Sequence, residues 1–186
     1  RKTLLIDLDL RKAAVHKIFG MAGDCGRFGI TEVLAGHAEL GDAVVPLPGA
    51  ENVDLVLAGT RAPNPGELLN TQRLEQVIAE ARERYEVVVL DTAPLLAVPD
   101  TRVLAPFADN LCLVVRAEYV PLGAVRRTLE LLDEAGTPPA GMVFNGFVEK
   151  KRLIGYNYTY GYYKYGRYGQ AYKYGHDHYG GYGDSD

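Results

Sequence analysis

The chain alternates short, continuously apolar runs with segments whose apolar residues recur every three to four positions. The runs predict strands at residues 3–6, 53–57, 87–90, 111–115 and 142–144. A run without polar alternation is typical of a parallel strand that is covered on both faces. The pattern therefore predicts a parallel sheet with helices between its strands.

Three segments carry helix signals. Apolar residues recur at helical spacing over residues 74–85, with charged residues on the opposite face. A second apolar stripe runs over residues 122–132 and stops before Gly136. Asp100 is a candidate N-cap for a third helix that reaches Leu104. Strands separated by helices predict an α/β fold with a doubly wound, mostly parallel sheet of at least five strands.

The composition changes after Gly155, where aliphatic core formers are absent and glycine alternates with tyrosine. Such a segment cannot bury enough apolar surface to offset the entropy of ordering. We therefore expect a domain at residues 1–154 and a flexible tail at 155–186, although an adhesive low-complexity segment is an alternative. Eleven of the 13 tyrosines are in this tail, namely Tyr156, Tyr158, Tyr160, Tyr162, Tyr163, Tyr165, Tyr168, Tyr172, Tyr174, Tyr179 and Tyr182.

Overall composition narrows the function classes. The 186 residues are 47% hydrophobic and 24% charged, as in a soluble globular domain. A net charge of −4 without a basic cluster argues against a nucleic-acid partner. The apolar runs are far shorter than the roughly 20 residues of a membrane span. Cys25 and Cys112 lack the spacing of a disulfide framework or a zinc site, which favours the cytoplasm.

Two carboxylates follow the first apolar run. Asp7 and Asp9 point the same way, because side chains alternate along a strand. At the carboxyl edge of a parallel sheet, where ligands bind, such a pair is suited to hold Mg²⁺ or to accept a proton from a hydroxyl. The alternative is that one of them only caps the following loop.

A third carboxylate, Asp91, ends the apolar run at 87–90, as a Walker B aspartate does. Two acidic strand ends in one parallel sheet predict a metal–nucleotide site where neighbouring strands converge. The side chains of Asp7 and Asp91 should then lie within about 12 Å of one another, so that one hydrated Mg²⁺ can connect them.

The motifs together resemble those of the bacterial tyrosine autokinases. The residues Leu-Leu-Ile-Asp-Leu-Asp-Leu-Arg at 4–11 resemble the extended Walker A′ motif of that family, and Val-Val-Val-Leu-Asp-Thr-Ala-Pro at 87–94 resembles its Walker B motif. The segment at 63–69 and the terminal tyrosine cluster are also similar to the family's. The acidic motifs alone also fit MinD-like and ParA-like ATPases.

The resemblance implies a P-loop NTPase fold of the MinD/ParA type and an ATP- and Mg²⁺-dependent protein-tyrosine autokinase. Such a kinase phosphorylates the eleven tail tyrosines in trans between neighbouring copies in a ring, and regulates capsule or exopolysaccharide synthesis and export. The implied partners are a transmembrane adaptor or fused membrane domain and a cognate tyrosine phosphatase. The implied location is the cytoplasmic face of the plasma membrane.

The resemblance also implies roles for individual residues. Asp7, Asp9 and Asp91 form the metal and catalytic site, with Asp7 the better candidate to polarise the tyrosine hydroxyl. Arg11 stabilises phosphate charge or binds a neighbouring subunit, or is a solvated loop arginine. Asn145 reads adenine, or only forms a turn before Gly146.

One departure from the family is large, because no G-x-x-x-x-G-K-[ST] sequence is present. Lys2 and Thr3 lead into a strand, whereas the P-loop Lys-Ser/Thr opens a helix. Since the family's P-loop would precede residue 1, we interpret the chain as a fragment that is inactive alone, with its first strand missing a neighbour. The alternatives are a MinD-like or ParA-like ATPase that positions a partner, and an inactive scaffold.

Overall fold

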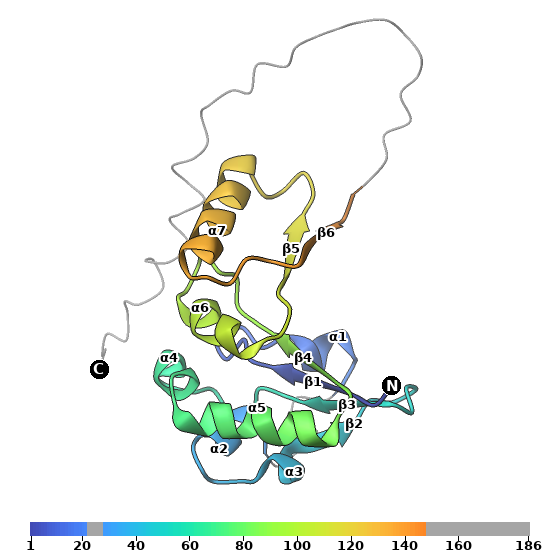
Figure 1. Cartoon of the computed structure of the whole chain (residues 1–186). Coiled ribbons are helices and arrows are strands. Elements are labelled where there is room, and N and C mark those ends of the chain that lie inside the picture. Colours follow the sequence, from blue (N-terminus) through green and yellow to red (C-terminus); the bar gives the residue numbers. More distant parts are fainter. Residues whose placement is uncertain (22–27, 148–186) are drawn as a thin grey trace, which may run out of the picture. The chain divides into compact units, whose positions relative to one another are not determined.

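The structure is a computed structural model that describes residues 1–21 and 28–147. These residues belong to one compact unit, Arg1–Phe147. The predicted tail and its eleven tyrosines lie outside the described residues. In chain order the elements (Figure 1) are β1 (Thr3–Asp7), α1 (Val15–Ile18), α2 (Ile30–Leu34), α3 (Leu40–Ala43), β2 (Val44–Pro46), β3 (Val53–Val56), α4 (Pro65–Leu69), α5 (Gln72–Arg84), β4 (Val87–Asp91), α6 (Asp100–Leu104), the 3₁₀ helix η1 (Ala105–Phe107), β5 (Cys112–Arg116), α7 (Leu122–Glu134) and β6 (Gly141–Asn145).

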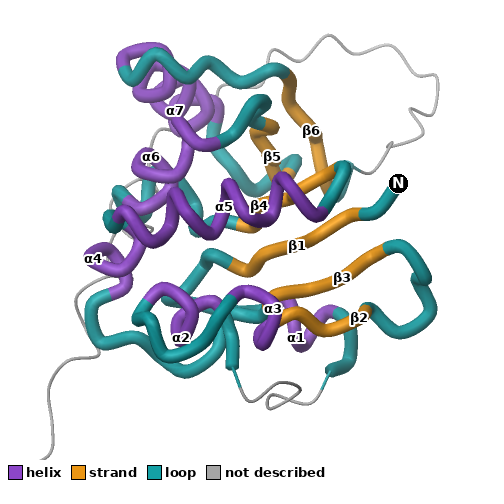
Figure 2. The backbone as a smooth tube through the Cα atoms, turned by 60° about the horizontal axis from the view of Figure 1, so that its bottom comes forward, coloured by secondary structure: helices purple, strands orange, loops and turns teal. Residues whose placement is uncertain are grey.

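The strands form two sheets. In the first, the order is β2–β3–β1–β4, with β1 parallel to both of its neighbours and β2 antiparallel at one edge (Figure 2). In the second, β5 and β6 pair in parallel. The predicted α/β class with mostly parallel strands is confirmed, and the five predicted strands are all present.

Two sequence-based expectations about strand pairing were wrong. The six strands do not form one sheet of five or more, since the larger sheet has four strands. The first strand does not lack a neighbour either, because β1 lies between β3 and β4. Within the described residues, β2 and β4 are the edges of this sheet. Strand pairing joins residues far apart in the chain, so the local pattern of apolar runs does not determine it.

Alternation along β1 distributes its side chains between two apolar cores. Leu4 and Ile6 pack on one face, in the larger core that also contains buried residues of α2, α3, α4 and α5. Leu5 faces the other way and packs with Leu55 and with Val15 of α1 in a smaller core. The four-stranded sheet therefore has apolar residues packed on both faces, as its continuous apolar runs predict.

The strong helix predictions are confirmed at α5 and α7. The apolar stripe of α5 is buried, including Leu74, Val77 and Ala81. A helix also starts at Asp100, but its N-cap is Pro99 and no side chain caps it. The cap assignment of Asp100 was therefore wrong, because its carboxylate binds an arginine instead. The short elements α1 to α4 and β2 were missed, because three to five residues are too few to show a period.

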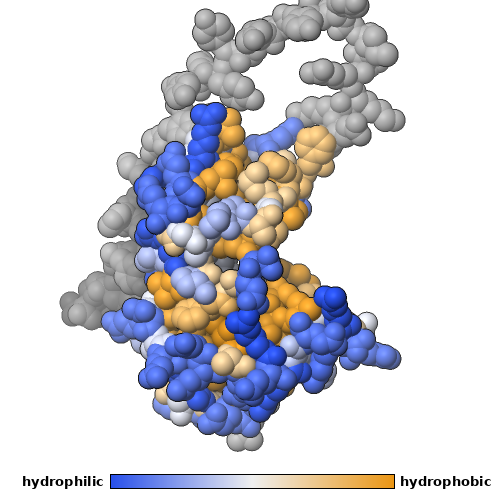
Figure 3. Space-filling model, viewed as in Figure 1, coloured by the Kyte–Doolittle hydropathy of each residue, from blue (hydrophilic) through white to orange (hydrophobic). Residues whose placement is uncertain are grey.

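The second sheet has an open apolar surface. Helix α7 buries Val125 and Leu132, and Val115 of β5 is also buried. Every residue of β6 is exposed, and Figure 3 shows apolar surface open to solvent over the strands. No helix within residues 1–21 and 28–147 is both long enough and apolar enough to cross a membrane.

Candidate active site

The carboxyl ends of β1 and β4 bring two of the predicted carboxylates together. Asp7 and Asp91 are register partners in this parallel pair. Adjacent strands are about 4.8 Å apart, so the two residues are well within the distance that one hydrated ion can connect. The two acidic strand ends therefore meet, as the sequence predicted from their positions after apolar runs.

The turn after β1 is held by both of its acidic residues. Asp7 is fully buried, and its two carboxylate oxygens accept hydrogen bonds from the backbone amides of Asp9 (3.2 Å) and Val15 (3.3 Å). Asp9 is half-buried and uses Oδ1 to accept from the amides of Arg11 (3.3 Å) and Lys12 (3.0 Å). Both residues thus cap the loop after β1, Asp7 through both carboxylate oxygens and Asp9 through Oδ1, and their role in a metal site remains a prediction.

Burial and mutual repulsion act together on these carboxylates. Burial raises the pKa of Asp7, and the nearby charges of Asp91 and Asp9 raise it further, while the amides of Val15 and Asp9 oppose the rise. Burial also raises the pKa of Asp91, with a further contribution from the charge of Asp9. For both Asp7 and Asp91, the negative charge of neighbouring carboxylates disfavours ionisation. A bound cation would relieve that repulsion.

The donor set fits Mg²⁺. All three side chains offer carboxylate oxygens, which this hard cation prefers. In the part of the chain that the structure describes, no three His, Cys, Asp or Glu side chains are arranged as a ready metal cage. Mg²⁺ usually retains several waters and binds through one or two carboxylates together with substrate phosphates. Asp9 and Asp91 offer two carboxylates of the kind that such an open site uses.

The two other predicted site residues lie in different places. The guanidinium of Arg11 pairs with the carboxylate of Asp100, with Nε to Oδ2 at 2.7 Å, which raises the pKa of Arg11. Asn145 ends β6 in the second sheet, where it is exposed and its backbone oxygen accepts from Ala117. Arg11 thus lies in the turn that carries Asp9, and Asn145 lies in the other sheet. The phosphate role of Arg11 and the adenine role of Asn145 remain predictions.

Sequence reasoning missed a second anchored turn, after β3. Glu32 accepts hydrogen bonds from the amides of Gly29 (2.7 Å) and Thr60 (3.1 Å) and from the Thr60 hydroxyl. Burial raises the pKa of Glu32, but these hydrogen bonds outweigh it and hold the pKa below its usual value. A Cβ on Gly29 would lie 2.3 Å from the backbone nitrogen of Gly59, so only glycine fits there. The glutamate three residues after Gly29 was an available capping signal.

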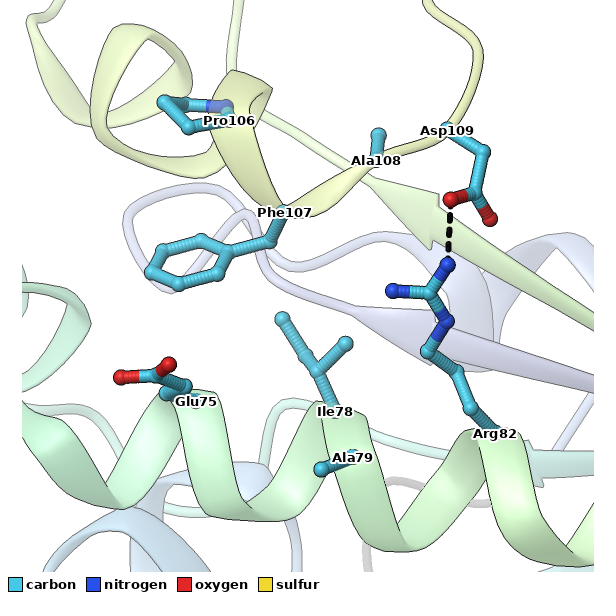
Figure 4. Close-up of a pocket in the computed structure, with 8 residues that line it drawn as sticks. All are labelled: Glu75, Ile78, Ala79, Arg82, Pro106, Phe107, Ala108 and Asp109. Carbon is cyan, nitrogen blue, oxygen red and sulfur yellow. Dashed lines mark hydrogen bonds and ion pairs between the residues drawn. The ribbon is translucent and has the colours of Figure 1, made fainter.

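A surface hollow lies away from the carboxylates, between α5 and η1 (Figure 4). It has a volume of about 250 Å³ and is lined by apolar side chains, including Ile78 and Phe107, and by the ion pair of Arg82 with Asp109. None of its lining residues is a predicted site residue. The hollow therefore does not compete with the carboxyl edge of the sheet as the candidate active site.

Comparison with known proteins identifies the family of this chain. A scan against models of protein families finds no match. Tyrosine-protein kinase Wzc of Salmonella typhimurium is 35% identical over 165 residues, which are 89% of this chain and 22% of Wzc. The chain thus spans about a fifth of the length of the curated relatives it matches.

Solved structures of a kinase domain and of MinD share the fold of this chain. MinD of Pyrococcus horikoshii, in complex with Mg-ADP, has a TM-score of 0.60 over 77% of this chain and 57% of MinD. Its 23% identity supports the shared fold alone. The VpsO kinase domain is 38% identical, with a TM-score of 0.72 over 77% of this chain and 70% of that domain. Because the chain is this similar to the VpsO kinase domain and to Wzc, it belongs to the bacterial tyrosine-protein kinase family.

Proposed function

We propose that this chain is the catalytic part of an ATP-dependent protein-tyrosine autokinase. It transfers the γ-phosphate of ATP to tyrosines of the tail, residues 155–186, in a neighbouring copy. The observation that carries the proposal is the register pairing of Asp7 with Asp91, with Asp9 beside them, in a chain of this family. Phosphoryl transfer needs mainly positioning and charge stabilisation, and converging carboxylates at the end of parallel strands serve both.

In this proposal, Asp9 and Asp91 hold Mg²⁺, because they are less buried than Asp7. The ion supplies neutralisation of the charge on the transferred phosphate. The 186 residues contain no P-loop sequence, so we propose that a P-loop segment outside them provides the backbone amides and the lysine that hold the phosphates.

The transfer step exchanges one P–O bond for another and moves one proton. The tyrosine oxygen attacks the γ-phosphorus, the bond from that phosphorus to the bridging oxygen of ADP breaks, and the phenolic proton passes to a carboxylate. The raised pKa of Asp7 suits it to accept that proton. Its complete burial and its two backbone hydrogen bonds count against direct contact with the hydroxyl. Asp9 is therefore the competing acceptor.

The cellular setting is part of the same proposal. We propose that several copies form a ring at the cytoplasmic face of the plasma membrane, linked to a transmembrane adaptor or a fused membrane domain. A cognate tyrosine phosphatase reverses the modification. Each phosphate adds about −1.5 to −2 charges to the tail, so phosphorylation at several tyrosines releases the tail from a neighbouring site. The process regulated is capsule or exopolysaccharide synthesis and export.

The test uses a fused kinase, defined as this chain joined behind a strand and a G-x-x-x-x-G-K-[ST] loop that opens a helix. With ATP and Mg²⁺ it should gain phosphotyrosine between Tyr156 and Tyr182, mapped by mass spectrometry. Replacement of Asp9 or Asp91 by Asn should lower the rate at least about 100-fold, because ion binding is lost. The exposed Asp133 of α7 supplies the matched control, and Asp133→Asn should leave the rate unchanged.

The same assay separates the kinase from its alternatives. The 186-residue chain alone should show negligible autophosphorylation, since the γ-phosphate has no cradle, yet its tail should be phosphorylated by a fused kinase that lacks residues 155–186. A fused kinase that hydrolyses ATP without modifying tyrosine would favour the MinD-like ATPase. A fused kinase that folds and does neither would favour the inactive scaffold.

A further inference from the structure

The first turn of α6 touches both of the loops that carry the site carboxylates. Asp100 accepts two hydrogen bonds from Arg11, from Nε to Oδ2 at 2.7 Å and from Nη2 to Oδ1 at 3.2 Å. Arg11 belongs to the turn after β1. The hydroxyl of the next residue, Thr101, donates to the backbone oxygen of Ala93 in the loop after β4. Two consecutive residues of one helix thus join the Asp7–Asp9 turn to the loop that follows Asp91.

On the β1 side, the contact continues to the carboxylates through successive hydrogen bonds. The amide of Arg11 donates to Asp9, and the amide of Asp9 donates to Asp7. The side chain of Arg11 then reaches Asp100, which lies 89 positions away in the chain. Asp100 binds the side chain of Arg11, and the amide of Arg11 binds Asp9. The orientation of Asp9 therefore depends on the position at which Asp100 fixes Arg11.

The pair of Arg11 and Asp100 differs from an ordinary surface ion pair. The side chain of Asp100 is 4% exposed and makes a two-pronged contact, whereas Arg82 and Asp109 are 50% and 74% exposed. A Cβ added to Gly66 of α4 would lie 3.4 Å from Asp100 Oδ1 and 3.8 Å from Arg11 Nη2. The Asp100 carboxylate is therefore buried beside a third element, α4, while the Arg11 side chain is 40% exposed. A buried carboxylate that loses its partner is strongly disfavoured.

We infer that Asp100 and Thr101 are positioning residues for phosphotransfer, which fix the two acidic loops relative to one another. This inference rests on the proposed kinase function for its consequence and on the described contacts for its geometry. Asp100 sets the turn with Asp7 and Asp9, and Thr101 sets the loop after Asp91. Neither needs to touch ATP or tyrosine.

Amide hydrogen exchange tests the geometry in the 186-residue chain, without any assumption about activity. Asp100→Asn should accelerate exchange at the amides of Arg11 and Lys12 about 10-fold, because Asp9 is no longer held in place. Thr101→Val should do the same at Ala97, whose amide bonds to Pro94 in the loop after β4. Asp109→Asn removes an exposed ion pair and is the matched control, with no change at these amides.

Kinetics in the fused kinase test the consequence. Asp100→Asn and Thr101→Val should lower kcat about 10- to 100-fold and raise the Mg²⁺ concentration for half-maximal rate, with less effect on KM for the tyrosine substrate. Thr101→Ser keeps the hydroxyl and should restore both values, whereas a helix that is only less stable would show no such rescue. Asp109→Asn should leave kcat and the Mg²⁺ dependence unchanged.

Several results would overturn the inference. These are unaltered exchange at Arg11, Lys12 and Ala97 in the two variants, or unaltered kcat and Mg²⁺ dependence in a fused kinase that is active. A fused kinase with no transfer even in its unsubstituted form would instead refute the proposed function. The exchange data would still decide whether α6 holds the loops.

Discussion

The four-stranded and the two-stranded sheet are built from similar apolar runs, yet they differ in what covers them. In β1, Leu4 is 0% and Ile6 is 1% exposed, because the strand lies between two neighbours and beneath helices. In β6, Val143 is 48% and Phe144 is 60% exposed. The comparison shows that an apolar run predicts a strand, whereas burial of that strand requires elements that pack on it.

The difference extends to chemistry. Asp7, at the end of a buried strand, has a raised pKa because its surroundings exclude water and contain other carboxylates. Asn145, at the corresponding end of β6, is exposed. A buried polar group is affected strongly by its neighbours, and an exposed one is affected little. The two carboxyl groups with raised pKa, Asp7 and Asp91, therefore lie at strand ends of the four-stranded sheet.

The largest expected effect comes from shortening a buried side chain of the four-stranded sheet, and the contrast is an exposed side chain of the two-stranded sheet. Leu4→Ala should lower the free energy of unfolding by about 2–5 kcal/mol, because it leaves a cavity in the larger core. Met142→Ala removes a comparable side chain that is 43% exposed, so its cost should be below about 1 kcal/mol. Urea denaturation of the two variants measures both values. Equal costs would mean that the two sheets are covered to a similar extent in solution.

A smaller effect of opposite sign is expected at Asp7. A carboxyl whose pKa is raised in the folded state contributes stability below its ordinary pKa, and that contribution is lost as the pH rises through the raised value. Asp7→Asn should therefore stabilise the chain by about 0.5–2 kcal/mol at pH 7. The gain should shrink as the pH falls toward about 4.

Asp133 of α7 is the control for this experiment, since it is exposed. Asp133→Asn should change the free energy of unfolding by less than about 0.5 kcal/mol at any pH between 4 and 8. Thermal unfolding across this pH range measures both variants. A loss of stability in Asp7→Asn at pH 7 would show that the hydrogen bonds from Asp9 and Val15 outweigh the burial of the charge.

The smallest effect on stability is expected on the open surface of the second sheet. Val143→Thr should change the free energy of unfolding by less than about 0.5 kcal/mol, because the side chain is half-exposed and threonine also suits a strand. It should still reduce self-association measured by light scattering, since it shrinks an exposed apolar patch. Val56→Thr, at a fully buried position in β3, is the contrasting variant and should be clearly destabilising.

Local order along the chain was sufficient to identify five of the six described strands, the long helices and the acidic residues at the ends of β1 and β4. Apolar runs located β1, β3, β4, β5 and β6, and the helical stripes located α5 and α7. The placement of Asp7 and Asp91 followed as well, because parallel strands present their carboxyl ends at one edge. These features depend on neighbours within a few positions, which the sequence displays directly.

Tertiary structure alone decided which strands pair, which runs are covered and which residues hold the acidic loops. No local pattern could show that the strands divide into two sheets or that β1 lies in the interior of one. The contact between Arg11 and Asp100 joins residues 89 positions apart, and Asp100 had looked like a helix cap in its local context. Pairing and burial arise from contacts between distant segments, so the same local signal at Asp100 fits either role until the chain is folded.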